Sequence, residues 1–159
     1  MNLLILLVMS LTMNKTLTVS SSAFAMDARI PSKYTCDGQN VSPELTIGNL
    51  PAGAKTLALI VEDPDAPKGT FDHWVMWNIP VGSKISENSA PGAQGQNGNK
   101  ENKYYGPCPP SNTHHYHFKV YALDTELNLA SSTNKKELME AMEGHILAEG
   151  ELVGLYSRQ

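Results

Sequence analysis

Residues 104–110 read YYGPCPP, and residues 114–121 read HHYHFKVY. The first run has the glycine and prolines of a stiff loop, and the second is rich in the aromatic residues that strands favour. Side chains alternate between the two faces of a strand, so His114 and Tyr116 are predicted to share one face. The stretch therefore predicts a β-strand over residues 115–123, with imidazole and phenol groups at its start directly beside a rigid loop.

A second polar cluster lies upstream, at the ends of two more predicted strands. Residues 57–61 form a continuous apolar run, typical of a central strand that is covered on both faces. The turn DPDAP at residues 63–67 follows it directly, and residues 73–79 predict a strand that starts with His73. Taken alone, such a turn and such a histidine are more often structural. Their position at strand ends, with Asp63 held beside two prolines, favours a small preformed anion pocket.

The remaining patterns predict a mostly β domain. A first strand is predicted over residues 17–24 and a short strand over residues 152–156. Residues 88–102 are polar and show no periodicity, which predicts a long surface loop. Trp74 and Trp77 have no basic residues between them, so we interpret them as core side chains rather than as a platform for stacking bases.

One helix is predicted near the end of the chain, over residues 134–143. Asn134 can serve as its N-cap, Glu137 occupies the capping-box position, and Gly144 suits the exit. The helix lies outside the run of strands. The pattern therefore favours an antiparallel β domain with peripheral helices over a βαβ arrangement.

Length and composition predict a single globular domain. The chain has 159 residues, of which 41% are hydrophobic and 18% charged, enough for an ordinary core. The net charge of −4, with no basic run, argues against a nucleic-acid partner. Cys36 and Cys108 can form one bridge at most, and their spacing matches no zinc motif, so free thiols are expected.

The beginning of the chain is read as an extension, residues 1–16, followed by the domain at residues 17–159. The apolar run at residues 3–9 is too short to span a membrane, and no basic residue precedes it. The AFA motif at residues 23–25 resembles a signal-peptidase site, but cleavage there would remove the predicted first strand. We therefore expect no cleavage, with Met13 as an alternative start. A cytoplasmic location is favoured over an exported or periplasmic one.

Two kinds of enzyme are compatible with individual residues, and a third, an enzyme with a cysteine or serine nucleophile, is not. Asp63 and His73 could act as an acid–base pair in a small hydrolase. His115 and His117 share a strand face and could hold a metal in a cupin-like enzyme, but no carboxylate follows closely to complete the site. Cys108 has no activating base near it in the sequence, and no Gly-x-Ser-x-Gly motif is present. We predict a binding protein with no catalytic residues, no metal and no cofactor.

Several of these motifs together resemble the phosphatidylethanolamine-binding protein family, and the likeness is strongest to its bacterial and archaeal Raf-kinase-inhibitor-like branch. The resemblance covers about residues 17–159, in the family's order. It rests on the segments at 34–38, 40–43, 63–67, 73–79, 106–107, 114–116, 120–124, 141–145 and 151–154.

The resemblance implies a large antiparallel sheet packed on a smaller sheet, with short helices and an anion pocket at one end. The implied ligand is a phosphate-containing small molecule or a phospholipid head group, such as phosphoethanolamine. A kinase or protease partner is implied by analogy only, and a homodimer is left open. His115 stands where an arginine is common, which removes a permanent cation from the pocket rim. The resemblance places in the pocket Asp63, His73, His114 and Tyr116, with Ala66 and Pro67 on one side and Gly106 and Pro107 on the wall.

Overall fold

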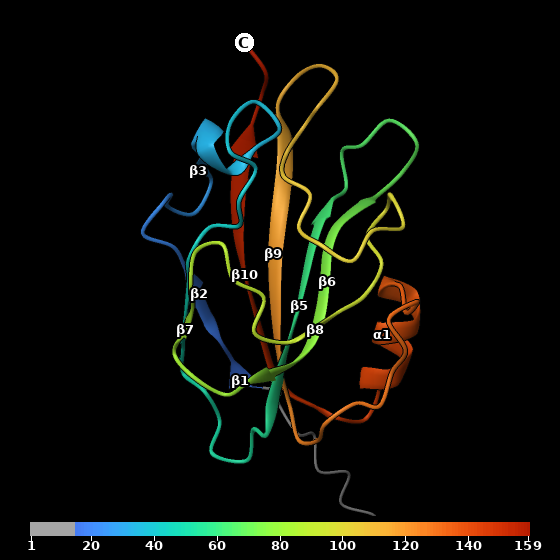
Figure 1. Cartoon of the computed structure of the whole chain (residues 1–159). Coiled ribbons are helices and arrows are strands. Elements are labelled where there is room, and N and C mark those ends of the chain that lie inside the picture. Colours follow the sequence, from blue (N-terminus) through green and yellow to red (C-terminus); the bar gives the residue numbers. More distant parts are fainter. Residues whose placement is uncertain (1–14) are drawn as a thin grey trace, which may run out of the picture.

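The computed structural model describes residues 15–159 and contains a seven-stranded sheet packed against a three-stranded sheet (Figure 1). The prediction of a large sheet on a smaller one is confirmed. The large sheet is mixed rather than antiparallel, because two short strands from the N-terminal part pair in parallel with the last strand. The expectations for residues 3–9 and Met13 lie outside the described residues.

The order of strands in the large sheet differs from their order in the sequence. Its path is β1 (Lys15–Thr16), β10 (Ile146–Tyr156), β9 (His114–Leu123), β5 (Thr56–Asp63), β6 (Phe71–Pro80) and β8 (Ala93–Gln94), with β3 (Ala28–Arg29) also paired to β10. The small sheet has the order β2 (Thr18–Ser20), β4 (Leu45–Gly48) and β7 (Lys84–Ile85). A 3-10 helix (Ser32–Tyr34) and one α-helix, α1 (Lys135–Met142), complete the described elements.

The strands predicted over residues 57–61, 73–79 and 115–123 are confirmed as the centres of β5, β6 and β9. β5 is buried on both faces because one face packs on the small sheet and the other is covered by α1. Trp74 and Trp77 on β6 are both buried, one in each of these two layers, which confirms their role in the core.

The last strand is much longer than the predicted one over residues 152–156. β10 runs for 11 residues, and two glycines inside it hid the pattern. A Cβ atom on Gly154 would lie 2.5 Å from Ile30 and 2.7 Å from Phe24, and one on Gly150 would collide with the Leu17 carbonyl oxygen. The glycines therefore allow the N-terminal segment to pack directly on the strand.

The predicted first strand, residues 17–24, is only partly a strand. β2 ends at Ser20, and the chain continues as an irregular segment. Leu17, Val19 and Phe24 are nevertheless buried in the main core. The predicted loop at residues 88–102 is also interrupted, by the two-residue strand β8.

The helix prediction is confirmed, including its cap. The Asn134 side chain accepts a hydrogen bond from the Glu137 amide, and the Glu137 carboxylate accepts one from the Asn134 amide. Lys135 then ties the helix to the sheet, with its Nζ 2.8 Å from a Glu62 oxygen and 2.9 Å from an Asp72 oxygen.

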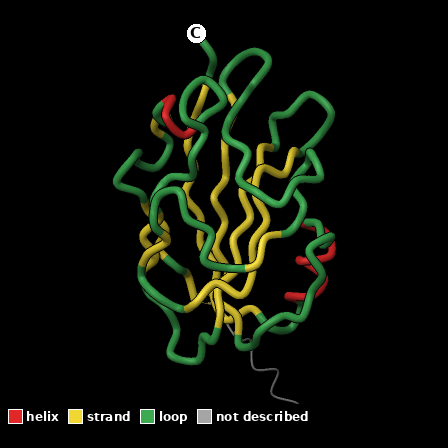
Figure 2. The backbone as a smooth tube through the Cα atoms, viewed as in Figure 1, coloured by secondary structure: helices red, strands yellow, loops and turns green. Residues whose placement is uncertain are grey.

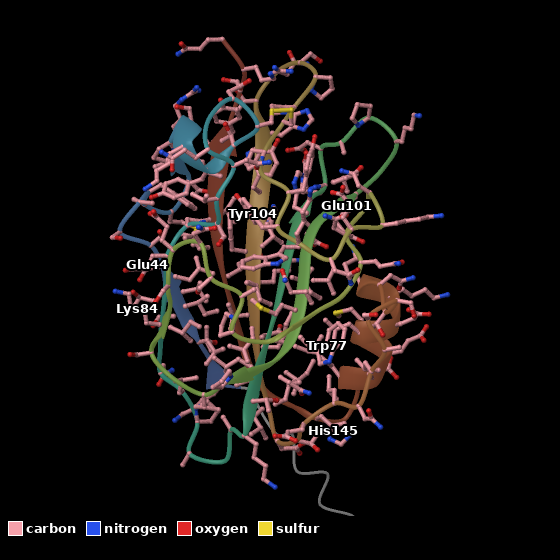
Figure 3. The ribbon with its side chains drawn as sticks, in the orientation of Figure 1. Glu44, Trp77, Lys84, Glu101, Tyr104 and His145 are labelled. Atoms are coloured by element: carbon pink, nitrogen blue, oxygen red, sulfur yellow. A yellow bond between two sulfur atoms is a disulfide. The ribbon has the colours of Figure 1, made fainter. Side chains whose placement is uncertain are left out.

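The two cysteines form a disulfide, so the expectation of free thiols is wrong. Cys36 and Cys108 are 72 residues apart in the sequence, but their Cα atoms are 5.4 Å apart (Figure 3, yellow bond). Folding brings together two loops at the same end of the molecule, and Figure 2 shows long loops gathered there. The Tyr104 hydroxyl also donates to the Tyr34 carbonyl oxygen at 2.8 Å, which binds the same two loops to each other.

Candidate functional site

A cavity of about 200 Å³ lies at this loop-rich end, where β5 ends and β6 and β9 begin. Six of the eight residues predicted for the pocket line it. Gly106 and Pro107 do not, and the wall on that side is built by their neighbours in the chain. The lining residues are Asp63, Ala66, Pro67, Phe71, His73, Asn99, Tyr105, Cys108, Pro109, Pro110, His114 and Tyr116.

Gly106 belongs to the wall loop, residues 104–110, but does not line the cavity and has a different role. Its amide donates to the Asn40 side-chain oxygen at 2.8 Å. A Cβ atom at this position would collide with that oxygen and with the Tyr34 carbonyl oxygen. The glycine therefore allows the wall loop to lie close against the loop that carries Cys36.

Asp63 and His114 form a buried pair at the floor of the cavity. His114 Nδ1 lies 2.7 Å from one Asp63 oxygen, and the Asp65 amide donates to the other oxygen at 2.8 Å. Asp63 is 3% exposed and His114 is 6% exposed. Asp63 therefore pairs directly with His114, and the pairing of Asp63 with His73 considered from the sequence is not found.

His73 is held by the wall loop instead. Its Nδ1 lies 2.6 Å from the Tyr105 carbonyl oxygen. A carbonyl oxygen can only accept, so Nδ1 carries the proton and Nε2 carries a lone pair in the neutral ring. The ring meets Phe71 and Tyr116 edge-on, with centroids 4.9 and 5.2 Å away. Burial lowers the pKa of His73, while the Tyr105 carbonyl and Asp63 act against it.

Tyr116 carries a hydroxyl group without a partner. Its side chain is completely buried, and among residues 15–159 its hydroxyl oxygen makes no hydrogen bond. Burial raises the pKa of Tyr116, and Asp63 adds to the effect, while the Cys108 backbone acts against it, so the phenol remains protonated near neutral pH. Because a buried polar group without a partner costs about 1–3 kcal/mol, a ligand that accepts from this hydroxyl would recover that energy.

The other two histidines of the run lie outside the cavity, on the opposite face of β9. His115 Nδ1 is 2.7 Å from an Asp65 oxygen, and hydrogen bonds from His115 lower the pKa of Asp65. His117 Nδ1 is 3.1 Å from a Glu151 oxygen. Across residues 15–159, no three His, Cys, Asp or Glu side chains have the arrangement of a metal site.

Sequence reasoning missed six of the lining residues, namely Phe71, Asn99, Tyr105, Cys108, Pro109 and Pro110. Four of them belong to the YYGPCPP run, which was recognised as a stiff loop but assigned to the pocket through its glycine and first proline. The signal for the others is weak. Asn99 is a polar residue within a long irregular segment, and Phe71 is one aromatic residue among many at strand positions.

Comparison with known proteins relates most of the described chain to one protein family. A family model described as phosphatidylethanolamine-binding protein matches residues 20–157. A UPF0098 protein of Methanothermobacter thermautotrophicus is 47% identical over 150 residues, covering 89% of this chain and 99% of its own. A UPF0098 protein of Pyrococcus horikoshii is 49% identical over 150 residues, covering 87% and 76%.

Solved structures with the same fold are also similar. The putative phosphatidylethanolamine-binding protein homologue CT736 of Chlamydia trachomatis aligns with a TM-score of 0.87 and 40% identity over 91% of this chain and 99% of its own. Escherichia coli YbcL, described as a member of the mammalian PEBP family, aligns with a TM-score of 0.83 and 27% identity over 90% and 99%. Within residues 15–159, no helix has the length and apolar character needed to cross a membrane.

Proposed function

The chain belongs to the phosphatidylethanolamine-binding protein family, and from this premise we propose that it is a binding protein for small phosphate-ester groups such as phosphoethanolamine. The proposed binding site is the cavity between the ends of β5, β6 and β9. The proposed polar contacts are made by His73, His114 and Tyr116, with Asp63 holding His114 in place.

The observation that carries the proposal is the buried Tyr116 hydroxyl without a partner, next to two fixed imidazoles in one cavity. Each imidazole has its Nδ1 engaged by the protein, so its orientation is set before any ligand arrives. Preformed polar groups of this kind lower the entropy that binding costs. The wall contributes rigidity through its prolines and the disulfide at Cys108.

Binding is favoured over hydrolysis by the chemistry of the same groups. A hydrolase needs an activated nucleophile or an activated water. Tyr116 remains protonated, and the Cys108 sulfur is held in the disulfide. His73 donates from Nδ1 to a carbonyl, so it lacks the charged partner that strengthens a general base. His114 has such a partner in Asp63, but no serine, threonine or free thiol is among the lining residues for it to activate.

Replacing His73 with alanine is expected to weaken binding of phosphoethanolamine by about tenfold to a hundredfold with the fold retained, because one hydrogen bond to a charged group contributes roughly 1.5–3 kcal/mol. Isothermal titration calorimetry on the two proteins measures the change. His117→Ala is the matched control, since it removes an imidazole from the outer face of the same sheet. Equal affinities for wild type and His73→Ala would show that His73 is only structural.

Replacing Tyr116 with phenylalanine is expected to separate binding from stability. The change removes only a hydroxyl that has no protein partner, so the midpoint of thermal unfolding should stay the same or rise. Affinity for phosphoethanolamine should nevertheless fall by roughly tenfold or more, because a donor to the anion is lost. A loss of stability with unchanged affinity would mean that the hydroxyl serves the fold and not a ligand.

A further inference from the structure

The hydrogen-bonding groups of the cavity do not match a fully deprotonated phosphate. Both imidazoles direct Nδ1–H at protein oxygens, of Tyr105 for His73 and of Asp63 for His114. In a neutral ring, the form that burial favours for His73, the remaining nitrogen, Nε2, is an acceptor. Neither Nε2 has a protein partner among residues 15–159. Among the lining residues, the other side-chain donors are then the hydroxyls of Tyr105 and Tyr116 and the amide of Asn99, and none of them carries a positive charge.

The charges of the lining residues also disfavour a fully deprotonated phosphate. None of the lining residues is a lysine or an arginine, and the Asp63 carboxylate lies at the floor. A dianion in such a site would place an oxygen against the Nε2 lone pair of a neutral His73 and near the Asp63 carboxylate. One additional proton converts an acceptor–acceptor contact between Nε2 and the phosphate into a charge-assisted hydrogen bond.

We propose that the cavity binds its anion together with one proton and is therefore selective for phosphate monoesters, which can carry that proton, over sulfate esters, which cannot. The inference rests on the proposed function and specifies the form of the ligand that the site accepts. The proton is shared between Nε2 of an imidazole and an oxygen of the anion, so the complex holds one proton more than the free protein and the free dianion.

The surroundings of the two rings support this proton count. Burial is the dominant influence on His73 and lowers its pKa, so the free protein presents a neutral ring near pH 7. A neighbouring anion acts in the opposite direction and favours the charged ring. The titratable groups that face His73 or His114 from the elements around them are Asp63 on β5, Asp72 on β6, Asp65 in the turn, Tyr105 in the wall loop and Tyr116 on β9.

Calorimetry in two buffers counts the proton directly. Phosphoethanolamine is titrated into the full chain at about pH 7.5, where a phosphate monoester is mostly dianionic because its second pKa is about 6. Buffers with small and large heats of ionisation, such as HEPES and Tris, give different binding heats if protons are exchanged. The expected result is an uptake close to one proton per ligand. Affinity should also rise as the pH falls from about 8 toward 6, because the complex is the more protonated state.

A control variant and a second ligand sharpen the result. His145 lies at the opposite end of the sheet (Figure 3), where its Nδ1 is 2.8 Å from Asp124, so His145→Gln should leave the proton uptake unchanged. The sulfate ester of ethanolamine has the same size and the same ammonium group, but its anion takes up no proton near neutral pH. It should bind at least about tenfold more weakly, because only a buried imidazole can then carry the proton, and burial disfavours the charged ring of His73.

The outcomes separate this inference from the proposed function. Binding of phosphoethanolamine without proton uptake, or equal binding of the sulfate ester, would overturn the inference and leave the binding function standing. The absence of saturable binding of either ester in both buffers would overturn the proposed function and the inference with it. Proton uptake together with preference for the phosphate ester supports both.

Discussion

A chain that begins at Met26 is expected not to fold. It would lack three side chains of the main core, Leu17, Val19 and Phe24, which are 3%, 7% and 6% exposed. Burying a large apolar side chain contributes about 1.5–3 kcal/mol, so the three together contribute roughly 4.5–9 kcal/mol. The net stability of a domain is only about 5–15 kcal/mol. The truncation would also remove the Phe24 ring that packs against Gly154 of β10.

Circular dichroism and thermal unfolding of two truncated chains measure this effect. A chain that begins at Met13 keeps every residue from 15 to 159 and should unfold cooperatively, whereas the chain from Met26 should show no cooperative transition. The mass of the protein from its natural host gives an independent reading. A folded chain from Met26 would contradict the expectation. A mature protein that starts at Met26 would also contradict it and would mean that the AFA motif is a true cleavage site.

Removing the disulfide is expected to lower the free energy of unfolding by about 4 kcal/mol. The bond closes a loop across 72 residues, and the entropy that such a crosslink removes from the unfolded chain increases with loop length. For a domain of this size, the loss corresponds to a fall of roughly 10 °C in the midpoint of thermal unfolding. The expected change applies to Cys36→Ser with Cys108→Ser, and to wild type treated with a reductant.

The same variants provide the control for this prediction. The double variant should unfold at the same temperature with and without reductant, since no disulfide remains to be broken. Identical midpoints for oxidised and reduced wild type would contradict the expected stabilisation. Because cytosolic thiols are normally kept reduced, the protein should reach its full stability only in an oxidising compartment or after purification in air.

The strongest local patterns in the sequence predicted their elements correctly. The apolar run inside β5 and the alternating pattern of β9 can each be recognised from residues that are neighbours in the sequence. The helix was predicted down to the interaction between Asn134 and Glu137, because a capping box is complete within four residues. His114 and Tyr116 were assigned to one face for the same reason, since side-chain alternation follows directly from strand geometry.

Features that depend on contacts between distant segments could not be predicted in this way. The Cys36–Cys108 bridge joins loops that only the fold brings together. The partner of Asp63 depends on strand neighbours, because β5 lies between β6 and β9 and has irregular pairing with β6 near its end. The resemblance to a known family predicted half of the residues that line the pocket, but it did not show that Tyr105 holds His73.

The closure of both edges of the large sheet limits how two molecules could associate. At one edge, β1 and β3 occupy hydrogen-bonding positions along β10. At the other edge, β8 and the loop after it cover β6. An incoming strand from a second molecule would first have to displace these segments. For the part of the chain that the structure describes, pairing of two molecules through the edges of the large sheet is therefore disfavoured. A homodimer, if one forms, would use side-chain surfaces rather than an extended sheet. The loop amides that cap β6 carbonyl oxygens are Gly95 to Val75, Gly98 to Asp72 and Tyr105 to His73.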